Sequence, residues 1–247
     1  MKTKHYYYFK DFEFISLNKE NWDKLRTNNT NDHFSIEKTQ NDYEENCERS
    51  IEYKKSAQVI VDLLKKYKLD NKLVSLGCGK GILEYHIKKI CPYIFMKCTD
   101  YTEKGIELLR KVFVNCDEFL VFDMLNQKEY NLLQTDRQTD RQTVILYRLS
   151  TEFSIEKWKK IFDYLYDAEV DNIIFVPSDA SKIEDIIKAK IFNVINFVRG
   201  RKETFCGWLY SEGEYNKMFR GNGKKRKYVI KEIEHLDKMS FYLLSRV

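Results

Sequence analysis

The stretch Val74-Ser75-Leu76-Gly77-Cys78-Gly79-Lys80-Gly81 decides the fold that this sequence predicts. Its apolar beginning reads as a strand, and residues 82–90 have the apolar spacing of a helix. Three glycines at alternate positions leave one side of the turn without side chains, so the backbone can bend sharply and a ligand can approach it closely. The N-terminus of the following helix, with its free N–H groups, favours a carboxylate or another polar group. We therefore expect a ligand-binding turn at residues 77–81.

Short apolar runs alternate with helical stretches around this turn. A helix is expected from residue 47 to residue 67 because apolar residues recur there at three- and four-residue spacing. The expected strands are residues 73–76, 93–99, 118–122, 143–148 and 171–176, and the expected helices are residues 82–90, 102–114, 154–166 and 181–198. Such alternation, with nearly continuous apolar strands, indicates a parallel sheet covered by helices on both faces.

The C-terminal part of the chain breaks this alternation. Residues 212–220 read as a helix, and residues 228–233 and 240–244 read as two strands. Their connection, residues 234–239, is too short for a parallel crossover, so the two strands are expected to pair antiparallel. The sequence therefore predicts an α/β fold whose mostly parallel sheet ends in an antiparallel hairpin.

The glycine spacing separates the possible ligands. A dinucleotide-binding turn has the pattern G-x-G-x-x-G, whereas this turn is G-x-G-x-G and lacks the G-K-[ST] ending of a P-loop. Gly77-Cys78-Gly79-Lys80-Gly81 resembles the first motif of the class I S-adenosylmethionine-dependent methyltransferases, and the resemblance extends over residues 56–247. It implies a Rossmann-like, seven-stranded sheet, S-adenosylmethionine (SAM) as the cofactor, and cofactor contacts from Gly77, Cys78, Gly79 and Gly81.

Two acidic residues stand at the ends of the next two expected strands. An acid at Asp100, about twenty residues beyond the glycines, can accept hydrogen bonds from both hydroxyls of a ribose, or it can cap the following helix. The resemblance implies that Asp100 binds the cofactor ribose, and Tyr101 is expected against the adenine. It further implies that Asp123 faces the adenine amino group and that Met124 supports the ring. A simple turn residue remains the alternative for Asp123.

Polar residues also follow the fourth expected strand. Ligands of open α/β sheets gather at the carboxyl ends of the strands, so the methyl group is expected to point toward residues 147–153. Glu152 is a candidate general base or a group that orients a hydroxyl acceptor, and Arg148 is the second catalytic candidate. The alternative for Glu152 is a contact with the first turn of the next helix.

One position departs from the family pattern. Many members carry an acid two residues before the first glycine, where this chain has Ser75. A serine can hydrogen-bond the turn or a water molecule, but it cannot pair with the ammonium group of the cofactor. A non-catalytic, methyltransferase-like binding subunit therefore stays open as an alternative. The glycine spacing disfavours a dehydrogenase.

Residues 1–50 differ from the rest of the chain. They begin with aromatic residues and continue with a stretch rich in Asn, Asp, Glu and Lys. We expect an irregular segment with short helices, which is either a cap over the pocket or an arm that packs beside the core. The chain is thus divided into an N-terminal extension or cap, residues 1–50, and a SAM-binding methyltransferase domain, residues 51–247.

Two further segments bear on the acceptor. Residues 134–143 read QTDRQTDRQT, which predicts an exposed polar loop. The unit can be encoded by a repeated ACAG tetranucleotide, and we hypothesise a slippable tract that switches the gene; mixed codons would exclude it. Switchable genes often modify surface structures, which favours a small-molecule or glycan hydroxyl as the acceptor. The aromatic segment 205–211 is expected either to line the acceptor pocket or to pack in the core.

Composition limits the remaining possibilities. The net charge of +5 is spread over many lysines rather than clustered, which favours a solvated surface, so a nucleic-acid acceptor is possible but not favoured. The six cysteines form no C-x-x-C pair and no zinc pattern, and the histidines lack ligand spacing, so no metal is expected. With no run of ~20 apolar residues to span a membrane, we expect a reduced, cytoplasmic enzyme. The oligomeric state is not indicated.

Overall fold

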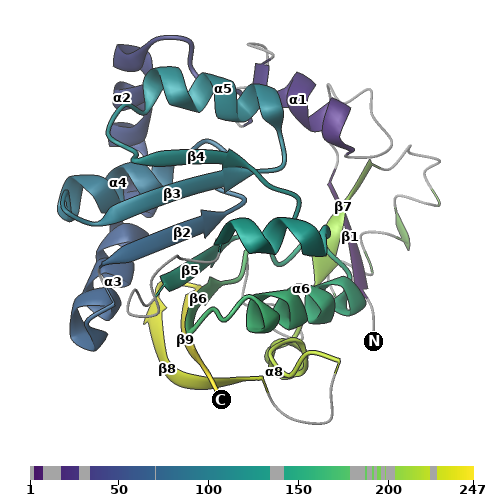
Figure 1. The fold of residues 1–247 in the computed structure, drawn as a ribbon. Helices are drawn as coiled ribbons and strands as arrows, with labels where there is room; N and C mark the ends of the chain where they lie inside the picture. Colours follow the sequence, from purple (N-terminus) through teal and green to yellow (C-terminus); the bar gives the residue numbers. More distant parts are fainter. Residues whose placement is uncertain are drawn as a thin grey trace.

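The computed structural model describes residues 3–7, 18–27, 34–69, 71–133, 142–178, 204–222 and 227–247, together with residues 187, 191, 194, 195 and 198. Figure 1 shows a twisted central sheet with helices on both faces, and the N-terminal segment lies beside this body.

A seven-stranded sheet forms the centre of the molecule. Its strands are β2 (Lys72–Leu76), β3 (Phe95–Asp100), β4 (Glu118–Val121), β5 (Gln142–Tyr147), β6 (Asn172–Val176), β8 (Tyr228–Leu236) and β9 (Met239–Arg246). Their spatial order is β4-β3-β2-β5-β6-β9-β8. Strands β2 to β6 run parallel, and β9 pairs antiparallel with both β6 and β8. The predicted architecture, including the antiparallel C-terminal hairpin, is confirmed.

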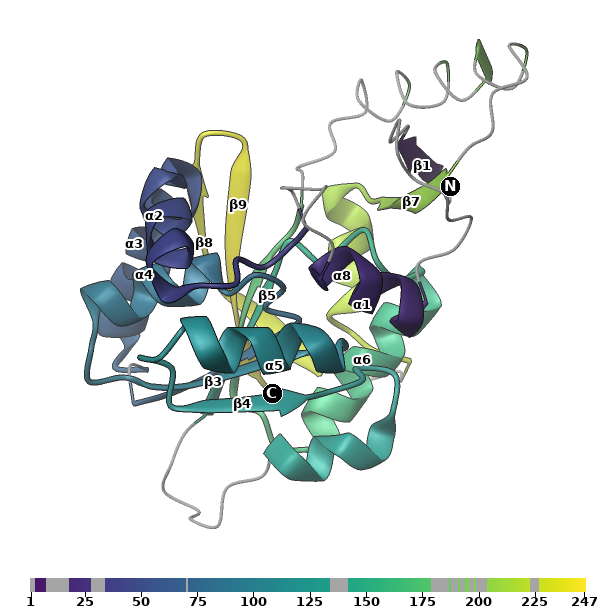
Figure 2. The ribbon, with the colours of Figure 1, turned by 90° about the horizontal axis from the view of Figure 1, so that it is seen from above.

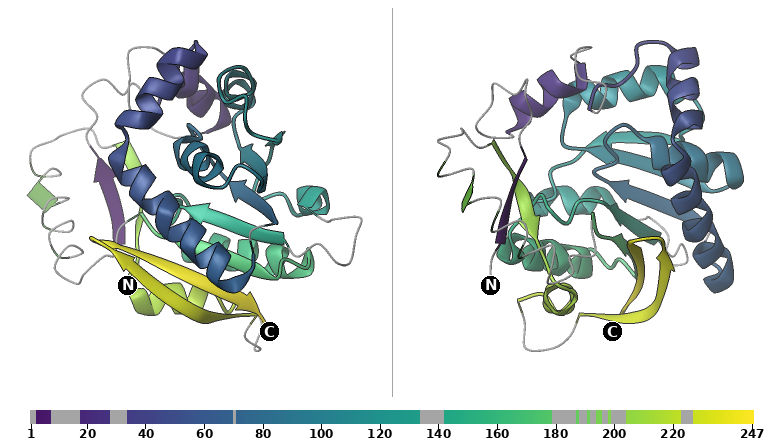
Figure 3. Two further views of the ribbon diagram at one scale, coloured as in Figure 1. Left: turned by 90° about the vertical axis from the view of Figure 1, so that its left-hand side faces the viewer. Right: turned by 180° about the vertical axis from the view of Figure 1, so that it is seen from behind.

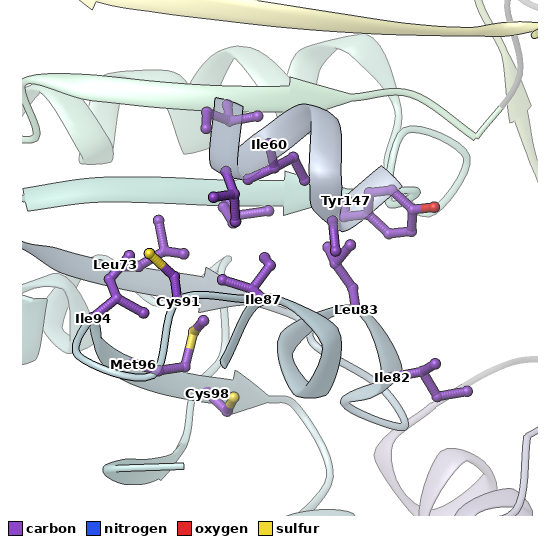
Figure 4. Close-up of a cluster of buried hydrophobic side chains, with 14 of the residues drawn as sticks. Ile60, Leu73, Ile82, Leu83, Ile87, Cys91, Ile94, Met96, Cys98 and Tyr147 are labelled. Carbon is purple, nitrogen blue, oxygen red and sulfur yellow. The ribbon is translucent and has the colours of Figure 1, made fainter. Parts of the chain in front are cut away.

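The sheet buries apolar side chains on both faces because consecutive strand residues point to opposite sides. In β2, Leu73 belongs to one hydrophobic cluster and Val74 to the other. Figure 4 shows the first cluster, in which side chains of helix α4 (Ile82–Ile90) lie over the sheet. The second cluster is rich in aromatic rings, and Trp158 of helix α6 (Ile155–Asp167) is fully buried in it. Two covered faces explain why the central strands read as continuous apolar runs.

The helices agree with the periodicity of the sequence in the central part of the chain. Helix α4 has the predicted bounds, and α5 (Glu103–Val112), α6 and α8 (Glu212–Met218) lie within the predicted ranges or extend them by one residue. A 3-10 helix, η1 (Gln127–Leu133), was not predicted. The helix predicted at residues 181–198 lies outside the described residues except for five single positions, all of them helical and exposed.

The N-terminal segment contains more regular structure than its sequence predicts. It forms strand β1 (Thr3–Tyr7), helix α1 (Lys19–Thr27) and helix α2 (Gln40–Arg49). Helix α2 ends before Ser50, and a new helix, α3 (Ile51–Tyr67), follows that residue. The helix expected from residue 47 is therefore two helices that begin at residue 40. Strand β1 pairs antiparallel with β7 (Thr204–Leu209) in a small separate sheet, which Figures 2 and 3 show beside the main body.

Two loop predictions need correction. The polar run 134–143 was expected to be an exposed loop leading into a strand at residue 143, but β5 already begins at Gln142, and both Gln142 and Thr143 are buried. They pair with Lys72 and Leu73 of β2, so the strand continues past its apolar part. Residues 134–141 lie outside the described residues. The hairpin connection is also shorter than predicted, because β8 continues to Leu236 and β9 begins at Met239.

Candidate cofactor and acceptor site

A cavity of about 710 Å³ lies at the carboxyl ends of the parallel strands, where the strand order reverses between β2 and β5. Such a position is where open α/β sheets bind ligands. Of the predicted site residues, Gly77, Cys78, Gly79, Asp100, Tyr101, Asp123, Met124, Arg148 and Glu152 line it. The structure thus brings together residues that the sequence had placed on four different strand ends, and leaves Gly81 outside the lining.

The glycine turn joins β2 to α4 with a backbone that suits glycine. Gly77, Gly79 and Gly81 have φ angles of 68°, 60° and 69°, in the left-handed region that L side chains rarely adopt. A Cβ on Gly79 would lie 3.1 Å from the guanidinium of Arg26, and a Cβ on Gly81 would lie 3.1 Å from the Tyr43 hydroxyl. Gly81 therefore faces the core, and the expected bare side of the turn is partly covered by neighbouring side chains.

Asp100 ties the end of β3 to the glycine turn. Its Oδ2 accepts a hydrogen bond from the Gly79 N–H at 3.0 Å, and its Oδ1 accepts from the N–H of Thr102, the N-cap of α5, at 3.0 Å. The carboxylate is buried and lies 3.8 Å from Nη2 of Arg26. Oδ1 also accepts from the Thr102 hydroxyl at 2.5 Å, so only Oδ2 retains further acceptor capacity. The N-cap of α5 is Thr102 itself, and Asp100 holds that residue from two positions earlier.

Tyr101, Asp123 and Met124 line the part of the cavity beside β3 and β4. Tyr101 is 38% exposed, and the partial burial of its side chain together with the Asp123 charge raises its pKa. The Asp123 carboxylate accepts from the Leu125 N–H at 2.9 Å, which is the contact of a turn residue. Asp123 therefore makes the backbone contact expected of a simple turn residue, and it also lines the cavity.

The two catalytic candidates differ in their surroundings. Arg148 has a φ of 57° at the end of β5, and its guanidinium pairs with Glu52 of α3 at 3.0 Å. Glu152 is half-buried, and burial raises the pKa of its carboxyl group to about 7. The Arg26 charge lowers that pKa and the Asp100 charge raises it. Glu152 therefore titrates near neutral pH, whereas Arg148 is held at the cavity rim by an ion pair.

Residues of the N-terminal segment complete the cavity wall, and sequence reasoning did not identify them. Trp22, Arg26 and Phe34 line the cavity. The Arg26 guanidinium lies 5.1 Å from the Trp22 ring and donates a hydrogen bond to the Phe34 carbonyl at 3.2 Å. Trp22 and Arg26 are four residues apart and share a face of α1. That spacing is the one signal that could have found them.

Other candidate positions lie away from the cavity. Ser75 is 1% exposed and does not line the cavity. In segment 205–211, Trp208 and Tyr210 pack with the second hydrophobic cluster, so these two residues follow the core-packing alternative. His86 contacts the Cys47 carbonyl at 2.9 Å, and His33 lies outside the described residues.

Within the described ranges, no group of three or more His, Cys, Asp or Glu side chains is placed to hold a metal ion. Five of the six cysteines are described, and all five are free thiols. Among the helices in the described part of the chain, none has the length and apolar character needed to cross a membrane.

By sequence, no family model and no curated protein matches this chain. By structure, it is similar to magnesium protoporphyrin IX methyltransferase from Synechocystis PCC 6803 with bound SAH, with a TM-score of 0.56, 14% identity, and coverage of 80% of this chain and 84% of that one. A putative O-methyltransferase from Nostoc punctiforme PCC 73102 has a TM-score of 0.54 and 16% identity over 78% of this chain and 56% of that one.

An O-methyltransferase family protein from Burkholderia thailandensis has a TM-score of 0.54 and 11% identity, over 78% of this chain and 57% of that one. The chain spans 51% of the length of the pyocyanin biosynthetic protein PhzM, to which it is similar at a TM-score of 0.50. Together with the strand order and the glycine turn, these similarities show that the chain has the fold of the class I S-adenosylmethionine-dependent methyltransferases.

Proposed function

We propose that this chain binds SAM in the cavity and transfers its methyl group to a hydroxyl group of a small molecule or glycan. The observation that carries the proposal is the hydrogen bond from the Gly79 N–H to the Asp100 carboxylate, at the point where the strand order reverses. This bond brings a glycine turn and a strand-end acid together at one side of the cavity. Solved neighbours of this fold carry SAH or SAM, which supports the choice of cofactor.

The cavity residues fit the three parts of this cofactor. Gly77, Cys78 and Gly79 would contact its amino-acid end, because they line the cavity where β2 passes into α4. Asp100 would bind the ribose, with Oδ2 as the acceptor because Oδ1 already accepts two hydrogen bonds from Thr102. The adenine would lie between Tyr101 and the pair Asp123-Met124, and Gly81 would shape the turn without touching the ligand. When bound, the cofactor supplies an electrophilic methyl group.

Glu152 would act on the acceptor hydroxyl. With a pKa of about 7, its carboxyl group is largely ionised above neutral pH and can then accept the hydroxyl proton. Arg148 would orient a polar group of the acceptor from the rim of the cavity, where it now pairs with Glu52. Methyl transfer depends mainly on alignment in a dry pocket, so one modest base is sufficient.

The walls of the cavity favour a small acceptor with an apolar or aromatic body. Four aromatic residues are among those that line the cavity: Trp22, Phe34, Tyr53 and Phe153. Aromatic rings bind planar or apolar groups and exclude water, which is the environment that methyl transfer requires. A nucleic-acid acceptor remains the second enzymatic choice, on the basis of the net charge of +5.

We assign the role of a cap to residues 1–50. Lys80 of the glycine turn pairs with Glu37 at 3.0 Å, and the Lys104 N–H at the start of α5 donates to Asp23 at 3.1 Å. These contacts hold the segment against the elements that form the cofactor pocket. The five free thiols are typical of a reducing compartment, so we place the reaction in the cytoplasm.

Two measurements test this function. Calorimetry with SAM, with S-adenosylhomocysteine (SAH) and with a nicotinamide dinucleotide should show binding of the first two only. Transfer of a tritiated methyl group from SAM to a panel of phenols, sugars and oligonucleotides should then label a hydroxyl-bearing small molecule or glycan. Binding of SAH without labelling of any acceptor would favour the non-catalytic binding subunit. Preferential binding of the dinucleotide would refute the cofactor assignment.

A further inference from the structure

The cavity contains an acid that the family motif does not include. Glu84 lies in the first turn of α4, three residues after Gly81, and is one of the residues that line the cavity although it is only 1% exposed. Ser75, which stands where many family members carry an acid, donates a hydrogen bond from its hydroxyl to Oε1 of Glu84 at 2.5 Å. The serine and the glutamate therefore form one unit, in which only the glutamate reaches the cavity.

The second carboxyl oxygen of Glu84 has no hydrogen-bond partner among the residues that the structure describes. Oε2 is buried, and within the described ranges no protein group donates a hydrogen bond to it. None of the ion pairs among the described residues involves Glu84 either. A buried carboxylate oxygen that lacks a donor is costly, so such an oxygen at a ligand cavity suits a donor that arrives with the ligand.

The groups that interact electrostatically with Glu84 do not supply a positive charge to balance its carboxylate. The acids and weak acids that interact with it are Asp100 on β3, Tyr43 on α2, Tyr53 on α3 and Cys78 in the glycine turn. None of these groups is positively charged. Burial and the Asp100 charge together raise the pKa of Glu84 to about 7, so a cationic ligand group would favour the ionised carboxylate.

We propose that Oε2 of Glu84 accepts a hydrogen bond from the ammonium group of SAM, so that Glu84 replaces the acid that many family members carry two residues before the first glycine. Ser75 holds the other carboxyl oxygen and thereby fixes the orientation of the side chain. The position of Glu84 directly after the glycine turn places it at the amino-acid end of the ligand. This inference rests on the proposed binding of SAM. It means that Glu84 supplies the acid that is missing at position 75.

The test compares two ligands that differ in the ammonium group alone. Calorimetry measures the affinity of SAH and of the SAH analogue in which hydrogen replaces the α-amino group, for the wild type and for Glu84→Gln. Glu84→Gln should weaken SAH binding roughly 10- to 100-fold, the size expected for a hydrogen bond between charged groups, and should change the affinity of the deaminated analogue by less than about 3-fold. Glu103→Gln, at an exposed acid in the first turn of α5, is the matched control.

A second measurement needs no variant of Glu84. In the wild type, the preference for SAH over the deaminated analogue should increase as the pH rises through about 7, because Glu84 then becomes charged. Retention of the preference in a folded Glu84→Gln, or a preference that does not vary between pH 6 and pH 8 in the wild type, would overturn the inference and leave the proposed function intact. Failure of the wild type to bind SAH at all would overturn both.

Discussion

Removal of the charge on Glu84 should make the unliganded protein more stable at neutral and alkaline pH. The native carboxyl group keeps its proton up to a pH of about 7, whereas a glutamate in the unfolded chain releases its proton near its ordinary pKa of 4.5. Between these values the native state binds more protons, so this group lowers the free energy of unfolding as the pH rises through the window, and its full cost is present above pH 7. Glu84→Gln has the same shape and cannot ionise.

The size of the effect follows from the pKa difference. At about 1.4 kcal/mol per pKa unit, the rise from 4.5 to about 7 corresponds to ~3 kcal/mol of stability lost by the wild type at pH 8. Glu84→Gln should regain up to that amount, which corresponds to an increase in Tm of roughly 6–12 °C for a chain of this size. At pH 4.5 the two proteins should differ little. The carboxyl group of Glu152 adds a cost of the same sign to both proteins, so it cancels in the comparison.

Urea denaturation of the wild type, Glu84→Gln and the control Glu103→Gln, at several pH values between 4.5 and 8, measures these differences. The control should follow the wild type throughout. Parallel stability curves for the wild type and Glu84→Gln would refute the reasoning, because they would mean that burial does not raise the pKa of Glu84 in the native protein. Higher stability combined with weaker SAH binding is the behaviour expected of a residue kept for function.

Three further changes probe the site. Asp100→Ala should weaken SAH binding by ~1–3 kcal/mol in calorimetry, because it removes the proposed ribose acceptor and strands the Gly79 N–H; unchanged affinity would leave Asp100 as a structural cap. Gly79→Ala should lower the free energy of unfolding by ~1–2 kcal/mol in urea, since its φ of 60° is unfavourable for a side chain; wild-type stability would contradict this strain. Wild-type kcat should increase as the pH rises through about 7, and Glu152→Gln should abolish this dependence in methyl-transfer assays; a retained dependence would assign it to another group.

Most of the sheet could be predicted because its signals are local. Each parallel strand is an apolar run buried on both faces, and each following helix has its own periodicity, as at residues 72–90. The pairing of β1 with β7 could not be predicted in this way, because the two strands lie almost two hundred residues apart and neither has the pattern of a core strand. Gln142 was assigned to the loop because of its polarity, although it is buried in β5 next to Thr143, the first residue of the predicted strand.

The site residues likewise fall into those with a local sequence signal and those that depend on tertiary contacts. The glycine turn and Asp100 follow directly from residue type and spacing, so the sequence alone was enough to propose them. Arg26 joins them only because α1 packs on α5, a tertiary contact with no motif. Glu84 reads in sequence as an ordinary acid in the first turn of a helix, and its importance depends on Ser75 behind it and the cavity in front of it.

A crystal structure of the protein with SAH tests the central claim most directly. It should place the amino-acid end of SAH at Gly77–Gly79, with the ammonium group within hydrogen-bond distance of Glu84 Oε2 and the ribose hydroxyls on Asp100. SAH bound elsewhere, or bound in this cavity with its amino-acid end away from the glycine turn, would contradict the account.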